Sequence, residues 1–116
     1  DSEDAAKGAL AAMLQDKYFE MHQKLFTAPG KANKEKVLRI ANEIGLDVPK
    51  LEKDMESQEV ADALAEAHGL AQSLGLQGTP LYLIGDRTIP GAPDDLYDQL
   101  VEKVGIIRKE GCKATC

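Results

Sequence analysis

Aromatic residues are scarce in this sequence. They make up 4% of its 116 residues, and tryptophan is absent. A chain of this kind has to build its core mainly from Leu, Ile, Val, Ala and Met. With 43% hydrophobic and 29% charged residues, the composition is still that of a folded domain rather than a disordered segment. The length fits one domain, or part of a larger one.

A surplus of positive charge is also lacking. The formal net charge is -6, so the chain has no excess of Lys and Arg with which to neutralise the phosphates of a nucleic acid. The same deficit disfavours binding to an anionic membrane surface. No apolar run approaches the roughly 20 residues of a membrane span. We therefore expect neither a nucleic-acid partner nor a membrane partner.

The first residues, DSEDAAKGAL, lack the basic and apolar pattern of a signal peptide. Because the chain begins at Asp1 without an initiator methionine, we expect a processed or trimmed chain, for which a missing leader does not exclude export. Only two cysteines are present, Cys112 and Cys116. This pair permits one disulfide, and hence an oxidising compartment, but does not require it.

Apolar residues at helical spacing predict five helices before residue 76. Asp16, Asn33 and Asp47 are candidate N-terminal caps for the second, third and fourth of these helices. Gly69 lies inside the predicted fifth helix, where glycine costs about 1 kcal/mol relative to alanine. We expect Gly69 to mark a close contact between helices.

The pattern changes after the fifth helix. The runs LYLI (81–84) and RTI (87–89) are short β-type segments separated by Gly85-Asp86, a two-residue connection typical of a hairpin. Asp94 or Asp95 leads into a predicted last helix, whose apolar residues run from Leu96 to Ile107. LYLI is apolar on both faces, which suits a buried strand, and a lone hairpin is marginal in water. We therefore expect that strands are missing here and that an open sheet edge is available for pairing with another chain.

Gly78, Thr79 and Pro80 lead into the first β-type run. Proline is tolerated at the start of a strand because its missing N–H lies outside the ladder, so an ordinary loop with a trans bond accounts for this sequence. The alternative is a cis Thr79-Pro80 bond. It would turn the N–H and C=O of Thr79 outward to pair with an extended polypeptide, and Gly78 has no side chain to block the approach. The residues alone leave both interpretations open.

Longer stretches decide between them: KYFEMHQKLF, IANEIGLDVPKLEKDMES, VADALAEAHGLAQSLGLQGTP and the run from LYLIGD to IPGA. In this order they resemble the C-terminal part of the DsbA family of thiol–disulfide oxidoreductases. The resemblance implies an incomplete thioredoxin-like fold of the α/β or α+β class, with a five-helix block followed by a β-hairpin and a C-terminal helix. The helical insertion domain would span residues 1–76, and the hairpin and last helix residues 77–116.

The resemblance also implies a function. Pro80 would be the family's cis-proline, and Gly78, Thr79 and Pro80 would bind the extended backbone of a protein thiol or disulfide substrate. The parent protein would be an exported enzyme, periplasmic in a bacterium, that needs no cofactor.

The family's Cys-x-x-Cys, whose thiolate is stabilised at a helix N-terminus, is absent from these residues. We therefore expect no catalytic residue in this chain and no dithiol exchange by the chain alone. Two alternatives remain open. One is a non-catalytic module that binds polypeptides or forms homo-oligomers through the open sheet edge. The other is a different DsbA-like branch, such as a glutathione-dependent transferase or isomerase with the same helical insertion.

Cys112 and Cys116 are one residue further apart than a redox motif, and they follow a helix C-terminus, which disfavours a thiolate. A surface disulfide, free thiols and a redox-active pair remain open, and we favour the disulfide. A zinc site would need two further ligands. His22 and His68 lie far away in the sequence, so we expect no metal site. Tyr97, on the last helix, is expected to pack against its neighbours.

Overall fold

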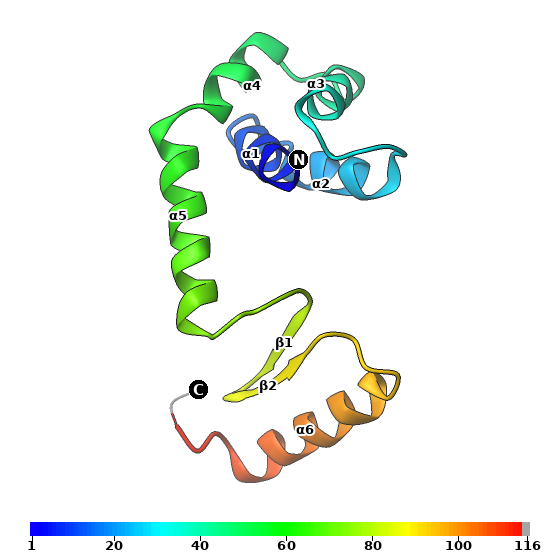
Figure 1. Ribbon diagram of the computed structural model, residues 1–116, viewed down its shortest axis with the longest axis vertical. Helices are drawn as coiled ribbons and strands as arrows, with labels where there is room; N and C mark the ends of the chain where they lie inside the picture. Colours follow the sequence, from blue (N-terminus) through cyan, green and yellow to red (C-terminus); the bar gives the residue numbers. More distant parts are fainter. Residues whose placement is uncertain (115–116) are drawn as a thin grey trace. The chain divides into compact units, whose positions relative to one another are not determined.

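The computed structural model describes residues 1–114, and its elements follow the order expected from the sequence (Figure 1). Five helices precede a hairpin and a final helix, as predicted. The bounds are α1 Ser2–Met13, α2 Tyr18–Thr27, α3 Lys34–Glu43, α4 Val48–Met55, α5 Gln58–Ser73, β1 Leu81–Ile84, β2 Arg87–Pro90 and α6 Leu96–Glu110.

The chain forms two compact units, Asp1–Leu70 and Ala71–Cys116. The division between them falls inside α5, which runs on to Ser73. The domains expected from the sequence, 1–76 and 77–116, follow the change from helical to β-type pattern instead, and they stay a prediction.

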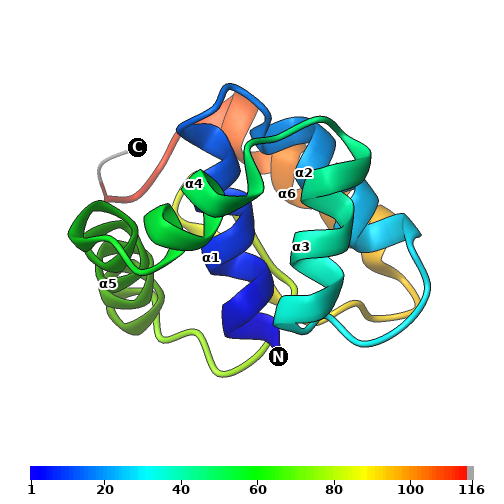
Figure 2. The same cartoon turned by 90° about the horizontal axis from the view of Figure 1, so that it is seen from above.

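In the first unit, α1 contacts α2, α3 and α4 (Figure 2). Its inward residues are small, and Ala11 and Ala12 are completely buried. Longer aliphatic side chains from the other helices fill the space around them. The core consists of Ala9, Ala11, Ala12, Met21, Val37, Ile40, Ala41, Leu46, Leu51, Met55 and Val60. Within the described residues this cluster contains no aromatic side chain, as the composition predicts.

A close approach between α1 and α3 occurs at Gly8. A Cβ atom at this position would come within 2.4 Å of Cγ1 of Val37, closer than two carbon atoms can approach without a shift. The sequence predicts a close contact between helices at Gly69 instead, and that prediction is wrong. A Cβ on Gly69 would meet no described atom within 4 Å, because the residue lies on an exposed stretch of α5.

Two of the three predicted caps are confirmed. The Asn33 side chain accepts a hydrogen bond from the Lys36 N–H, and the Asp47 side chain accepts one from the Lys50 N–H. The prediction for Asp16 is wrong. Lys17 occupies the N-cap position of α2 without a capping hydrogen bond from its side chain, and Asp16 adopts a left-handed φ of 58° in the turn before it. Aspartate tolerates this conformation better than most side chains do.

Lys36 is a buried charged residue of the first unit, with 6% of its surface exposed. Its Nζ donates to the carbonyl oxygens of Leu25 (3.0 Å), Ala28 (2.6 Å) and Gly30 (3.4 Å). These carbonyls belong to the end of α2 and the loop after it, where the helix dipole is negative. The ammonium group therefore satisfies carbonyls that the helix leaves without partners.

The second unit is organised around the antiparallel pair of β1 and β2, in which Tyr82 pairs with Ile89 and Ile84 with Arg87. The two residues left between the strands form the predicted turn. Ile89 is 2% exposed, and α6 contacts β1. One face of the hairpin is therefore covered. Contrary to expectation, Tyr97 of α6 is 77% exposed.

Candidate functional site

The Gly78-Thr79-Pro80 segment joins α5 to β1, and all three residues are exposed. The Thr79-Pro80 bond is cis, as the resemblance to the DsbA family implies. The carbonyl of Pro80 accepts a hydrogen bond of 2.8 Å from the Gly91 N–H. This bond continues the hairpin pairing by one step beyond the pair of Leu81 with Pro90. Pro80 is thus fixed to the hairpin, while the residues before it are not.

The backbone of Thr79 is open to a partner. Within residues 1–114, no hydrogen bond engages its N–H or its C=O. A Cβ on Gly78 would also meet no described atom within 4 Å, so nothing hinders an approach from that side. Main-chain N–H and C=O groups are strong donors and acceptors. An extended polypeptide that lies along this segment could pair with both groups of Thr79.

A hollow of about 380 Å³ adjoins this segment. Its walls come from the second unit alone, namely Leu74, Gly75, Leu76, Gln77, Gly78, Thr79, Leu81, Thr88, Pro90 and Gly91. Side chains alternate between the two faces of a strand, so Leu81, Thr88 and Pro90 lie on the face opposite Ile89. The open face of the hairpin and the segment before β1 therefore form one continuous surface.

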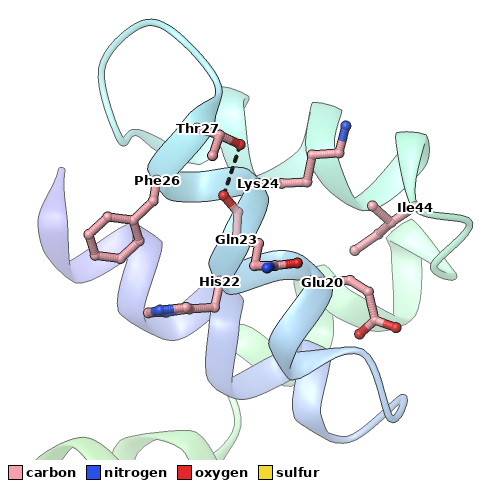
Figure 3. A pocket seen from close by; sticks show the side chains of 7 residues that line it. All are labelled: Glu20, His22, Gln23, Lys24, Phe26, Thr27 and Ile44. Atoms are coloured by element: carbon pink, nitrogen blue, oxygen red, sulfur yellow. Dashed lines mark hydrogen bonds between the residues drawn. The ribbon is translucent and has the colours of Figure 1, made fainter.

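A second hollow, of about 490 Å³, lies on the first unit and is shown in Figure 3. Its lining residues are Glu20, His22, Gln23, Lys24, Phe26, Thr27 and Ile44. They carry charges of both signs, and the marked hydrogen bond, from Thr27 Oγ1 to the Gln23 carbonyl at 2.9 Å, only ties one turn of α2 to the next. This hollow lacks a set of convergent polar groups.

His22 lies in a row of rings on α2; the sequence predicts one mostly apolar face that holds Tyr18, His22 and Phe26, but not the contacts between their rings. Its ring stacks on Tyr18 with centroids 5.9 Å apart and lies 4.8 Å from the ring of Phe26. The spacing of four residues between the three rings could have revealed this row. His68 is exposed on α5. Over residues 1–114, His, Cys, Asp and Glu side chains nowhere gather in a group of three that could hold a metal ion.

At the far end of the hairpin, the Asp86 carboxylate contacts the C-terminal tail. Its Oδ2 accepts hydrogen bonds from the N–H groups of Lys113 (2.7 Å) and Ala114 (3.1 Å). The bond from Ala114, and after it the bond from Lys113, hold the pKa of Asp86 below its ordinary value, because they favour the charged form. The expected bridge between Cys112 and Cys116 includes a residue outside the described part of the chain, so it stays a prediction.

Within residues 1–114, no helix is both long and apolar enough to cross a bilayer. Comparison with known proteins adds two findings. A family model described as a DSBA-like thioredoxin domain matches residues 1–105. A crystal structure of a thioredoxin-like oxidoreductase from Silicibacter pomeroyi DSS-3 is 44% identical over 93% of this chain, with a TM-score of 0.79. The present chain spans 61% of the length of that structure. The search of curated proteins found no significant match to this chain.

Proposed function

Because the chain belongs to the DSBA-like thioredoxin domain family, we propose that it supplies the polypeptide-binding segment and the helical domain of a thiol–disulfide oxidoreductase. The binding residues are Gly78, Thr79 and Pro80. The substrate is a protein with a thiol or a disulfide. The enzyme acts outside the cytoplasm, periplasmically in a bacterium.

The open backbone of Thr79 is the observation that carries this proposal. A substrate chain lies extended beside it and accepts a hydrogen bond from its N–H while donating one to its C=O. Gly78 leaves room for that chain, since a Cβ there would meet no described atom within 4 Å. A substrate side chain next to the reacting cysteine enters the hollow beside Leu81 and Pro90.

The reacting thiol pair is not among these 116 residues, which contain no Cys-x-x-Cys. The matched oxidoreductase is longer, since this chain spans 61% of it. We place the thiol pair in the part of the whole protein that corresponds to the remainder of that oxidoreductase. A thiolate of one partner attacks a sulfur of the other partner's disulfide, a mixed disulfide forms, and the displaced sulfur leaves as a thiolate and takes up a proton. Thr79 and its neighbours hold the substrate in line for this step.

A peptide-binding experiment tests the proposal. The probe is an extended peptide in which serine replaces the reacting cysteine, so that binding is measured without redox chemistry. We expect it to shift the NMR signals of Gly78, Thr79 and Leu81. We expect Gly78→Val to weaken binding about tenfold, because the branched side chain occupies the path of the substrate backbone. The matched control is Gly105→Ala, on an equally open position of α6. Equal binding by both variants would refute the proposed site.

A further inference from the structure

One face of α6 points away from the hairpin that the helix covers (Figure 1). Ile107 marks the covered side, because a Cβ on Gly85 of the hairpin turn would lie 2.8 Å from its Cδ1. On the opposite side, Tyr97 is 77% exposed and Val101 is 56% exposed. A Cβ on Gly105 would meet no described atom within 4 Å. Residues 1–114 therefore leave this face of α6 uncovered.

Tyr97, Val101 and Gly105 follow one another at intervals of four residues, so they form a single stripe along the helix. Val101 is at the centre of the stripe, with Tyr97 about 6 Å to one side along the helix axis and Gly105 about 6 Å to the other. A two-fold axis beside Val101 would bring the ring of Tyr97 in one copy over Gly105 of a second copy, and the reverse. The stripe is thus complementary to itself when two α6 helices run antiparallel.

The charged residues beside the stripe have the same symmetry. Asp94 and Asp98 lie at the start of α6, whereas Arg108 and Lys109 lie in its last turn. All four are exposed, and among residues 1–114 none of their side chains forms an ion pair or a hydrogen bond. Antiparallel helices place the acidic start of one copy next to the basic end of the other, whereas parallel helices would place like charges together. Side chains also lean toward the N-terminus of their own helix, which brings the opposite charges of the two copies closer.

We propose that the face of α6 defined by Tyr97, Val101 and Gly105 is an interface at which two copies of the protein associate with their α6 helices antiparallel. The partner is a second copy because the apolar stripe and the charges at its two ends each match their own image. The rings of Tyr97 supply much of the contact area, and the opposite charges at the two ends select the antiparallel arrangement. A single helix face offers less than the roughly 800 Å² per partner of a standard interface, so the dimer is weak and reversible.

Sedimentation velocity of the whole protein at several concentrations tests the proposal by giving the dissociation constant of the dimer. One variant carries Asp94→Lys and Asp98→Lys, so that both ends of the face are basic. The other carries Arg108→Glu and Lys109→Glu, so that both ends are acidic. We expect each reversal to raise the dissociation constant about tenfold or more, because like charges then meet at both ends of the pair. An equimolar mixture of the two variants should associate nearly as tightly as the wild type, since opposite charges meet again.

The matched control changes the net charge by the same amount on another helix. Glu59→Lys with Glu66→Lys reverses two exposed acidic residues of α5 and should leave the dissociation constant unchanged. Association through the open strand edge of the hairpin would survive the reversals on α6, which distinguishes the two surfaces.

Four results would each overturn the proposal. They are a wild type that stays monomeric up to about 1 mM, α6 variants that associate as tightly as the wild type, a mixture of the two variants that stays monomeric, and a control that loses as much affinity as the α6 variants.

Discussion

Gly8 of α1 lies against Val37 of α3 so closely that a Cβ on Gly8 would stand 2.4 Å from Cγ1 of Val37. Because Val37 is completely buried, it has little room to move away. We expect Gly8→Ala to lower the free energy of unfolding by about 1–3 kcal/mol, the usual cost of overpacking a core.

Urea unfolding measures this loss, and a second substitution separates overpacking from other causes. Val37→Ala removes the two methyl groups that Gly8→Ala would meet. The double variant should therefore be more stable than the sum of the two single losses predicts. Strict additivity would show that the contact between α1 and α3 is looser than described.

Lys36 is expected to be the most sensitive charged residue of the first unit. Lys36→Met keeps an unbranched side chain as far as Cε but removes Nζ, and so leaves the carbonyls of Leu25 and Ala28 without their donor. We predict a loss of roughly 1.5–3 kcal/mol in the free energy of unfolding, in the range for hydrogen bonds to a charged group. Lys31→Met, on an exposed position of the nearby loop, is the control. Losses of equal size in both variants would contradict the role given to Lys36.

The docking of the tail on Asp86 should depend on pH. Hydrogen bonds from Ala114 and Lys113 lower the pKa of Asp86 in the folded chain. A lowered pKa means that the charged form is favoured in the docked state, so docking is fully stabilised above the ordinary aspartate pKa of about 3.9. The stabilisation is lost as the pH falls through the lowered pKa. The amide signals of Lys113 and Ala114 should follow this titration, and in Asp86→Asn they should not.

Much of the fold could be predicted from local patterns. Helical spacing gave the order of the elements, and the side chains of Asn33 and Asp47 marked helix starts because a cap acts over three residues. The turn at Gly85 followed from the same kind of short-range signal. A longer resemblance was needed to choose the cis form at Thr79-Pro80, which the residues alone left open.

Apart from the cap at Asp16, what the sequence did not reveal are contacts that depend on how one element packs against another. A lysine usually lies in solvent, and nothing near Lys36 in the sequence shows that three carbonyls converge on its ammonium group. Gly69 and Gly8 are both glycines in predicted helices, and only the packing of α1 on α3 distinguishes them. The bonds from Asp86 to the tail span 27 and 28 residues, beyond the reach of any local pattern.

The open strand edge of the hairpin favours association of this chain with other copies of itself. Leu83 of β1 is 55% exposed, and over residues 1–114 the sheet has only two strands. An unprotected strand edge beside exposed apolar side chains invites pairing with another copy. We expect the 116-residue chain to form dimers or larger species at high concentration, and Leu83→Lys to weaken this association. Sedimentation that shows a monomer at every concentration would count against it.

The binding role of Thr79 is tested most directly in the whole protein, with its own thiol pair and a substrate trapped as a mixed disulfide. Hydrogen exchange at the Thr79 amide is the measurement. We predict that this amide, which has no hydrogen-bond partner among residues 1–114, becomes protected in the trapped complex, and that Gly78→Val slows formation of the complex. An amide that exchanges equally fast with and without the trapped substrate would contradict it.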